Sequence, residues 1–184
     1  DVRRVTRGPL DANYVEVCLP QPRPGRGRAH RHGRLVHDHA HDDADHHHGR
    51  GEHSHAHGRS VREIRRLISR AKLVPDVRDR ALAIFEALAT AEARVHGTDV
   101  DDVHFHEVGA VDAIVDVTGV AIGLHRLGIE RITCSPLPLG HGSVNSDHGV
   151  LPLPAPATLE LLRGVPIVPA GIAWETVTPT GAAI

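Results

Sequence analysis

One stretch decides the fold of this chain, His104-Phe105-His106-Glu107-Val108-Gly109-Ala110-Val111-Asp112-Ala113-Ile114-Val115-Asp116. Its pattern predicts a strand, a glycine turn and the start of a helix. Because side chains alternate between faces along a strand, His104 and His106 are expected to point the same way. Gly109 permits a sharp turn, and Asp112 and Asp116, four residues apart, are expected on one helical face. The sequence therefore predicts that two imidazoles and two carboxylates converge where the strand gives way to the helix.

The residues that follow this stretch predict the fold class. An apolar helix is expected over Val111–Leu127, closed by Gly128, and the β-branched segment Ile129–Cys134 is expected to be a buried strand. Val165–Val168 is a further short strand candidate. A strand, a helix and a second strand form a βαβ unit, which favours a parallel sheet. We therefore predict an α/β fold with a βαβ-containing, mostly parallel sheet and flanking helices, interrupted by a disordered His-rich insertion.

Two helices are expected before the deciding stretch. The residues 60–63 (Ser-Val-Arg-Glu) form a capping box, and the helix that follows places Ile64, Leu67 and Ile68 on its inner face. A second helix is expected from Pro75 to about His96, ending at Gly97. His96 is interpreted as a favourable charge at the helix C-terminus. The apolar face of this helix comprises Val77, Ala81, Ile84, Leu88 and Ala91.

Three regions are predicted along the chain. Residues 1–22 contain a strand, Asn13–Leu19, which is expected to pair with a sheet formed elsewhere. Residues 23–59 form a linker, and residues 60–184 form an α/β domain. The chain begins without Met and stops where a helix has barely begun, so we expect it to be part of a longer protein whose N-terminal and C-terminal regions lie outside it.

The predicted linker is rich in histidine. It combines Gly, Arg, Asp and His with few residues able to fill a core, so disorder is expected in the absence of metal. Imidazole is a common ligand for Ni, Zn, Cu and Co, and metal capture is favoured over a plain linker or a purification tag. The histidines of this segment are His30, His32, His37, His39, His41, His46, His47, His48, His53, His55 and His57.

Composition excludes several classes of function. The formal net charge is −2, which argues against general nucleic-acid binding. No apolar run approaches the roughly 20 residues of a membrane span. Cys18 and Cys134 have no metal-ligand spacing, and they fit a reduced, cytoplasmic setting.

Further candidate residues lie in C-terminal loops. His141 and His148, each beside a glycine, are candidates for the same metal pocket, with turn chemistry as the equal alternative. Thr178, Thr180 and Gly181 could hold an anion such as phosphate at a helix N-terminus, although turn and capping roles are favoured for the threonines.

The carboxylates of the deciding stretch also have two interpretations. Asp112 could cap the helix, and Asp116 could be a surface charge. However, Asp116 lies in a run of aliphatic residues, where an unpaired carboxylate is costly. This favours a role for the carboxylates in the site, either as metal ligands or as a base.

Several motifs in this order resemble the LarC family, the nickel-insertion proteins of nickel-pincer cofactor biosynthesis. The motifs are residues 104–112 (HFHEVGAVD), 135–140 (SPLPLG), 148–158 (HGVLPLPAPAT) and 178–183 (TPTGAA). The resemblance implies a CTP-dependent nickel insertase, or cyclometallase, that acts as a nickel-inserting lyase. Its substrate would be pyridinium-3,5-bisthiocarboxylate mononucleotide and its product the nickel-pincer cofactor of lactate racemase. CTP with Mg²⁺ or Mn²⁺ would bind in a C-terminal region outside this chain, and any homo-oligomer would form through the missing regions.

With this resemblance, the residues suggest roles. His104 and His106 are hypothesised as the nickel station, and Glu107, Asp112 or Asp116 as ligand or base. Two rival functions remain at this point. One is a His-rich nickel or zinc binding or storage protein, and the other is a zinc hydrolase with an activated water.

Overall fold

In the computed structural model of the protein, residues 2–7, 10–15, 58–106, 108–146 and 148–184 are described. They belong to two units, one comprising Asp1–His55 and the other Ala56–Ile184. Residues 16–57, which include all eleven histidines of the predicted linker, lie outside the described residues. The metal-binding role expected for part of this segment therefore stays a prediction. The candidate ligands concerned are His46, His47, His48, His53, His55 and His57.

The first unit contains a β-hairpin. Strand β1 (Val2–Arg7) pairs antiparallel with β2 (Leu10–Val15), with Val2 opposite Val15 and Arg7 opposite Leu10. The predicted strand Asn13–Leu19 overlaps β2 only over its first three residues, and its remainder lies outside the described residues. The expected pairing with a distant sheet is wrong, because the strand that precedes β2 is its partner.

Helix α1 begins at the capping box that the sequence predicts. After the short strand β3 (Arg59–Ser60), α1 spans Val61–Arg70. The backbone N–H of Glu63 donates to Ser60 Oγ at 3.2 Å, and the N–H of Ser60 donates to Glu63 Oε2 at 2.8 Å. The predicted inner face is confirmed for Ile64 and Ile68 but not for Leu67, which is 46% exposed.

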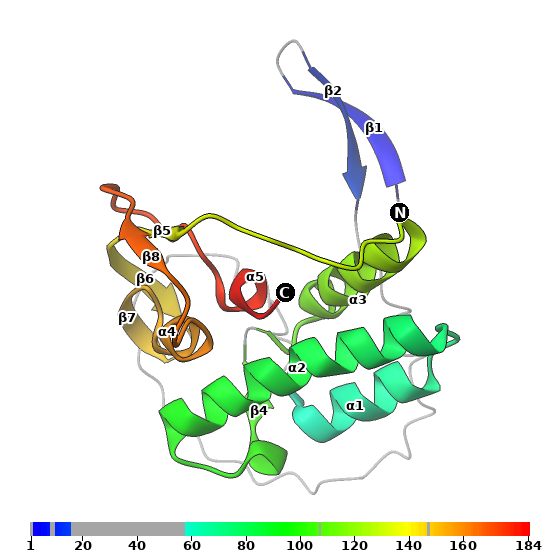
Figure 1. The fold of residues 1–184 in the computed structure, drawn as a ribbon, viewed down its shortest axis with the longest axis horizontal. Helices are drawn as coiled ribbons and strands as arrows, with labels where there is room; N and C mark the ends of the chain where they lie inside the picture. The colour runs from blue at the N-terminus through cyan, green and yellow to red at the C-terminus, as the bar shows by residue number, and fades with distance from the viewer. Residues whose placement is uncertain (1, 8–9, 16–57, 107, 147) are drawn as a thin grey trace, which may run out of the picture. The chain divides into compact units, whose positions relative to one another are not determined.

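Three helices build the core of the second unit. Figure 1 shows α2 (Pro75–His96) between α1 and α3 (Val111–Arg126). Both helices end close to their predicted limits, and Gly97 closes α2 in the left-handed conformation at φ 64°. The predicted buried face of α2 is confirmed. The core comprises Val61, Ile64, Ile68, Val77, Ala81, Ile84, Phe85, Leu88, Ala89, Ala93, Val103, Phe105, Val108, Ile114, Val117 and Ala121.

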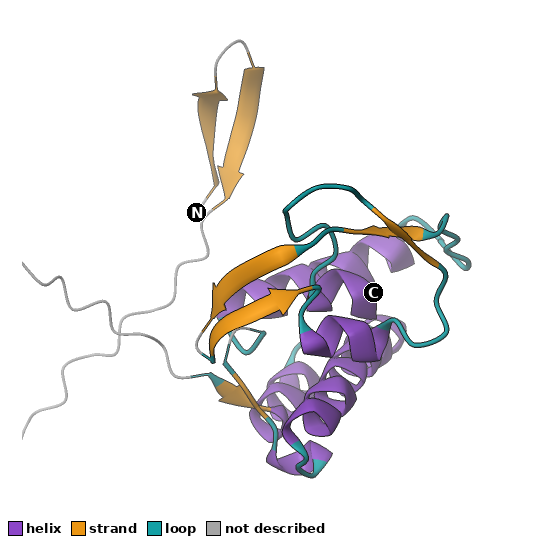
Figure 2. Ribbon diagram, turned by 90° about the vertical axis from the view of Figure 1, so that its left-hand side faces the viewer, coloured by secondary structure: helices purple, strands orange, loops and turns teal. Residues whose placement is uncertain are grey.

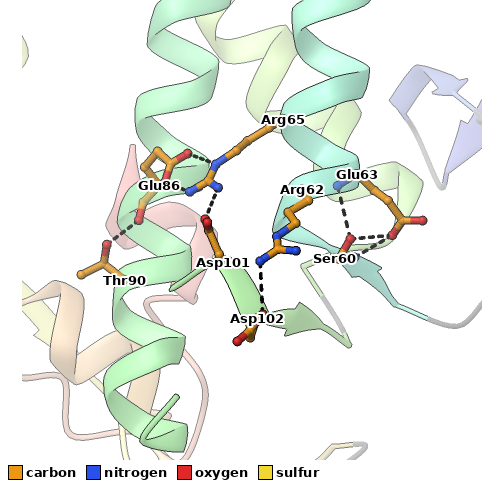
Figure 3. A network of polar contacts seen from close by, with 8 residues as sticks. All are labelled: Ser60, Arg62, Glu63, Arg65, Glu86, Thr90, Asp101 and Asp102. Carbon is orange, nitrogen blue, oxygen red and sulfur yellow. Dashed lines mark hydrogen bonds and ion pairs between the residues drawn. The ribbon is translucent and has the colours of Figure 1, made fainter. Parts of the chain in front are cut away.

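A polar network joins α1 to its neighbours (Figure 3). The guanidinium of Arg65 contacts both carboxylate oxygens of Glu86 on α2, with Nη2 2.6 Å from Oε2. It also pairs with Asp101 in the 3₁₀ turn η1 (Val100–Asp102). The hydrogen bonds that Arg65 donates to Glu86 and Asp101 raise the pKa of Arg65, and Arg65 in turn lowers the pKa of Asp101. Since η1 leads directly into the deciding stretch, this network fixes where that stretch begins.

The predicted sheet is the main error in the expected fold. The strands of the described residues form four separate two-stranded sheets, three antiparallel and one parallel (Figure 2). Strand β4 (His104–Phe105) pairs antiparallel with β3. Residues 129–134 follow α3 as expected but are not a strand, and Ile132 is 55% exposed. The predicted βαβ unit is therefore absent from the described residues, because its second strand is not formed and β4 pairs only with β3.

The C-terminal part of the second unit covers one end of α2. Strands β6 (Gly142–Ser146) and β7 (Gly149–Leu153) form an antiparallel hairpin, while β5 (Leu137–Leu139) pairs in parallel with β8 (Ile167–Pro169). The predicted strand Val165–Val168 thus exists in shifted form. Two short helices, α4 (Pro156–Leu161) and α5 (Pro179–Ala183), pack against α2. Among the described helices, none has the length and apolar character that crossing a membrane requires.

Candidate functional site

The two histidines of the deciding stretch point away from the core. Phe105, the residue between them, is 2% exposed, whereas His104 and His106 are exposed. Pairing with β3 places Arg59 opposite Phe105 and Ser60 opposite His104. The predicted alternation is therefore confirmed, and both imidazoles line one pocket.

Gly109 allows the backbone to pack closely against β3 and β4, and it does not form a strained turn. A Cβ at this position would lie 2.5 Å from the carbonyl oxygen of Phe105 and 2.6 Å from the backbone nitrogen of Arg59. The guanidinium Nη1 of Arg59 donates to the carbonyl oxygen of Gly109 at 2.8 Å. A residue without a side chain thus lets the segment after β4 lie directly against β3, and this contact sets the direction in which α3 starts.

The pocket over β4 contains four imidazoles. It has a volume of about 160 Å³ and is formed by the end of α2, β4, the β6–β7 hairpin, and the first residues of α4 and α5. We call it the histidine pocket. Its polar side chains are His96, His104, His106, His148 and Glu92, and its remaining lining residues are Val95, Phe105, Val108, Leu151, Ala155, Pro156, Ala157 and Pro179.

His148 lies at the centre of a row of three rings. Its ring centroid is 4.7 Å from that of His106, in an edge-to-face arrangement, and 5.0 Å from that of His96. The turn of the β6–β7 hairpin holds it there. The backbone N–H of His148 donates to Ser146 Oγ at 3.1 Å, and this hydroxyl donates to the carbonyl oxygen of Gly149 at 3.0 Å. Residues from three separate segments are thus brought together.

His96 and Glu92 are site residues that sequence reasoning missed. His96 does lie in the last turn of α2, as its interpretation as a C-terminal charge requires. Its Nε2 also lies 3.4 Å from Oε2 of Glu92, one turn earlier, and both side chains line the histidine pocket. The spacing of four residues between a glutamate and a histidine on a helix is the signal that could have identified the pair.

The carboxylates of α3 line a different pocket. Asp112 and Asp116 are exposed, on the same side of α3, beside a cavity of about 360 Å³. We call it the acidic pocket, and its other polar lining residues are Ser146, Glu175, Thr178 and Thr180. Although Asp116 lies in a run of aliphatic residues, its carboxylate is exposed, because the residues of α3 that face the core are Ile114, Val117 and Ala121. The cost of burying an unpaired carboxylate therefore does not apply to it.

The expected convergence of imidazoles and carboxylates on one point is not found. The histidine pocket and the acidic pocket adjoin each other and share Val108, Leu151, Ala155 and Pro179 as a common wall. Within the described ranges, no three His, Cys, Asp or Glu side chains are already arranged to hold a metal ion. The arrangement is therefore a pair of neighbouring pockets, one rich in nitrogen ligands and one rich in oxygen ligands.

Two of the remaining candidates lie outside these pockets or outside the described residues. His141 is exposed and lines neither pocket; its backbone N–H donates to the carbonyl oxygen of Ile172 at 3.1 Å. Glu107 lies outside the described residues. Both interpretations that the sequence offered for His141, metal ligand and turn residue, therefore stay predictions.

The candidate anion site at the start of α5 is used for capping. Thr178 is the N-cap residue, and its Oγ1 accepts from the backbone N–H of Gly181 at 3.1 Å. The capping role that the sequence favoured for Thr178 is confirmed. Thr180 lies in the first turn of α5, where it lines the acidic pocket.

An ion pair joins two elements that enclose the histidine pocket. Nη1 of Arg94 on α2 lies 3.6 Å from Oε2 of Glu160 on α4. Glu160 also accepts from Arg163 at 2.6 Å, and this hydrogen bond, with the nearby positive charges of Arg163 and Arg94, lowers the pKa of Glu160. The carboxylate thus stays charged, and its pair with Arg94 adds to the packing of α4 against α2.

Comparison with known proteins identifies the family. The family model described as "Nickel insertion protein" matches residues 1–184. The chain belongs to the nickel insertion protein family. The resemblance to this family that the sequence motifs suggested is confirmed.

Three curated relatives illustrate the similarity. A "Putative nickel insertion protein" of Syntrophobacter fumaroxidans is 60% identical over 126 residues, or 68% of this chain and 32% of the relative. A "Pyridinium-3,5-bisthiocarboxylic acid mononucleotide nickel insertion protein" of Desulfitobacterium hafniense is 55% identical over 126 residues, 68% of this chain and 31% of the relative. A protein with that same name from a Nocardioides species is 48% identical over 170 residues, 92% of this chain and 41% of the relative. No solved structure matches the chain significantly.

The chain spans only about a third of the length of the first two of these relatives. Imidazole is a common ligand for nickel, and the description of the family gives the cluster of imidazoles a chemical context.

Proposed function

We propose that this chain forms part of a CTP-dependent nickel insertase, a cyclometallase that places Ni(II) into pyridinium-3,5-bisthiocarboxylate mononucleotide. The product would be the nickel-pincer cofactor of lactate racemase, and the enzyme would be a nickel-inserting lyase of the cytoplasm. The printed names of the relatives support the metal and the substrate. The structural observation that carries the proposal is the histidine pocket, where four imidazoles face one cavity beside a second cavity lined by carboxylates.

The histidine pocket would hold the nickel substrate before insertion. Imidazole nitrogen is a ligand of intermediate softness that binds Ni(II), whereas thiolate and related sulfur groups are softer. His104, His106 and His148 would therefore bind the ion and release it to the two sulfur atoms of the acceptor.

The acidic pocket would supply the base for insertion. Forming a nickel–carbon bond on the pyridinium ring breaks a carbon–hydrogen bond, so that a proton must leave while the carbon's electron pair passes to nickel. Asp112 and Asp116 lie beside the histidine pocket and are exposed to the cavity. Either could accept this proton, and their negative charge would also favour the cationic ring. Glu107, at the junction itself, remains a third candidate from the sequence.

Nucleotide recognition would be divided between regions. CTP with Mg²⁺ or Mn²⁺ would bind to a C-terminal region of the full-length protein that lies outside this chain. At the start of α5, the backbone N–H of Gly181 already donates to the hydroxyl of Thr178. Thr180 lines the acidic pocket, and its side chain would contact the mononucleotide substrate there.

The His-rich segment would increase the nickel supply. The eleven histidines of residues 23–59, among them His46, His47 and His48, would raise the local nickel concentration near the pocket. A role in supply alone predicts that the segment is needed only when nickel is scarce.

The test uses the full-length protein that contains this chain, supplied with nickel, CTP, Mn²⁺ and the dithiocarboxylate mononucleotide. The double variant His104→Ala/His106→Ala should abolish formation of the metallated product at saturating nickel. His125→Gln is the matched control, because His125 is an exposed histidine that pairs with Asp76 away from both pockets. Unchanged turnover in the double variant would show that His104 and His106 do not hold the nickel for insertion.

A deletion separates the proposal from its two rivals. Without residues 23–59, an insertase should retain turnover in excess nickel, whereas a storage protein would lose its function. Hydrolysis of esters or amides with zinc and without CTP would instead favour a zinc hydrolase and contradict the proposal.

A further inference from the structure

We propose that His96 of α2 is a nickel ligand together with His106 and His148, and that Glu92 positions His96 for this role. The inference rests on the proposed function and deepens it, because it adds a histidine of α2 to those of β4 and the β6–β7 hairpin and so builds the site from three segments. Its basis is the row of three imidazole rings, together with the pairing of Glu92 with His96.

The spacing of the rings matches that of ligands sharing one ion. A metal–nitrogen bond of about 2 Å in a tetrahedral site places the centroids of two imidazole ligands about 5 Å apart. The observed centroid separations are 5.0 Å for His96 and His148 and 4.7 Å for His106 and His148. The three rings therefore already lie at the distances from the central ring that coordination would require.

Binding would require the side chains to turn. The ligand atoms of the described residues are not yet directed at a common point. All three histidines are exposed, so their side chains are not locked by core packing. The second side-chain torsion of histidine has a broad, shallow energy profile, and rotation about it costs little. Binding would thus convert ring–ring contacts into ring–metal contacts through side-chain rotation.

Glu92 supplies the feature that distinguishes a metal ligand from a surface histidine. A histidine that binds a metal through one nitrogen usually donates its other N–H to a carboxylate or carbonyl, which fixes the tautomer and raises the basicity of the ligand. Oε2 of Glu92 lies 3.4 Å from Nε2 of His96, and only 21% of the glutamate side chain is exposed. This pairing leaves Nδ1 of His96 for the ion.

Three neutral nitrogens suit an ion that has to leave again. They would leave the remaining coordination positions of nickel open to an incoming ligand, as in metal sites that exchange substrate. His104 lines the pocket but has no ring contact with the other histidines that the structure records. Its contribution to affinity should therefore be smaller than that of His106.

The experiment measures Ni²⁺ binding by calorimetry on the complete chain. All eleven histidines of residues 23–59 are first replaced by Asn, so that they do not bind the ion. In this background His96→Asn, His106→Asn and His148→Asn should each weaken Ni²⁺ binding at least tenfold, and His104→Asn less. His125→Asn should change the affinity by less than twofold. An unchanged thermal midpoint shows that each variant is folded.

A spectroscopic measurement tests Glu92 separately. Glu92→Gln should weaken Ni²⁺ binding about tenfold or more, and it should shift the visible d–d absorption bands of bound Co²⁺, which a purely structural role would leave unchanged. Unaltered bands and affinity would overturn the positioning role.

The outcomes also distinguish the inference from the proposed function. If His106→Asn and His148→Asn weaken binding but His96→Asn does not, the three-segment site is wrong while the nickel station stands. If none of the pocket variants affects Ni²⁺ binding, both fail.

Discussion

Phe105, which separates His104 from His106, packs its ring against Phe85 of α2 at a centroid distance of 6.3 Å and an interplanar angle of 58°. Both phenylalanines are almost fully buried. The contact anchors the two-residue strand β4 to the longest helix of the fold. Since β4 has only β3 as a strand partner among the described residues, this aromatic pair is what fixes the outward direction of the two imidazoles.

Replacing Phe105 should therefore lower the stability of the fold. Phe105→Ala should lower the free energy of unfolding by about 3–5 kcal/mol, because it removes a buried ring and leaves a cavity against Phe85. Denaturant unfolding measures this loss. Trp174→Ala is the control, since Trp174 is 70% exposed and should change stability by no more than about 0.5 kcal/mol. Equal effects of the two substitutions would contradict the anchoring role.

Gly109 should tolerate no side chain. Gly109→Ala places a Cβ against the backbone of Phe105 and Arg59, and it should cost about 1–3 kcal/mol of unfolding free energy. Gly119→Ala, in the exposed part of α3 with open space around it, should instead be stabilising by about 0.5–1 kcal/mol. Thermal unfolding of the two variants compares them directly. A stable Gly109→Ala variant would mean that the segment after β4 does not lie against β3.

The capping box should make stability depend on pH. Hydrogen bonds from the Ser60 backbone and hydroxyl lower the pKa of Glu63 below its ordinary value. A carboxyl group with a lowered folded pKa contributes stability that is present above its unfolded pKa, about 4.3, and is lost as the pH falls through the folded value. Glu63→Gln should therefore be less stable than the unmodified chain at pH 7, and the difference should shrink below about pH 4. Unfolding curves between pH 7 and pH 2.5 test this, and a constant difference would contradict it.

The acidic pocket should affect chemistry but not nickel binding. In the full-length protein, Asp112→Asn/Asp116→Asn should lower the rate of insertion by about 10²–10⁴-fold if either residue is the base. Nickel affinity should stay within twofold, because these carboxylates do not line the histidine pocket. Single-turnover insertion and calorimetry provide the two measurements. A loss of nickel affinity with unchanged insertion at saturating nickel would make the carboxylates ligands instead.

The helices could be predicted from the sequence because their signals are local. The Ser60–Glu63 capping box, Pro75 at the first position of α2 and Gly97 at its end all act within one turn of the residues concerned. The strands could not be predicted in the same way. β1 contains Arg3, Arg4 and Arg7 and shows no regular apolar alternation, so the hairpin gave no pattern to detect. Residues 129–134 have a strand-like composition, but a strand also requires a partner.

The site was predictable where it depended on the period of a strand. Alternation alone places His104 and His106 on one side of Phe105, and this prediction is confirmed. The separation of the carboxylates from the imidazoles was not predictable, because it depends on how α3 lies relative to β4. The approach of His96 and His148 likewise depends on how the end of α2 lies relative to the β6–β7 hairpin. Such contacts between distant segments leave no trace in local spacing.

The central claim is that the histidine pocket binds nickel. Anomalous diffraction at the nickel absorption edge, on crystals of the complete chain with the histidines of residues 23–59 replaced by Asn and grown with Ni²⁺, tests it most directly. The account predicts an anomalous peak about 2 Å from imidazole nitrogens of the pocket, with His106 and His148 among the ligands. Nickel peaks found only elsewhere, with the pocket rings in their mutual contacts, would contradict it.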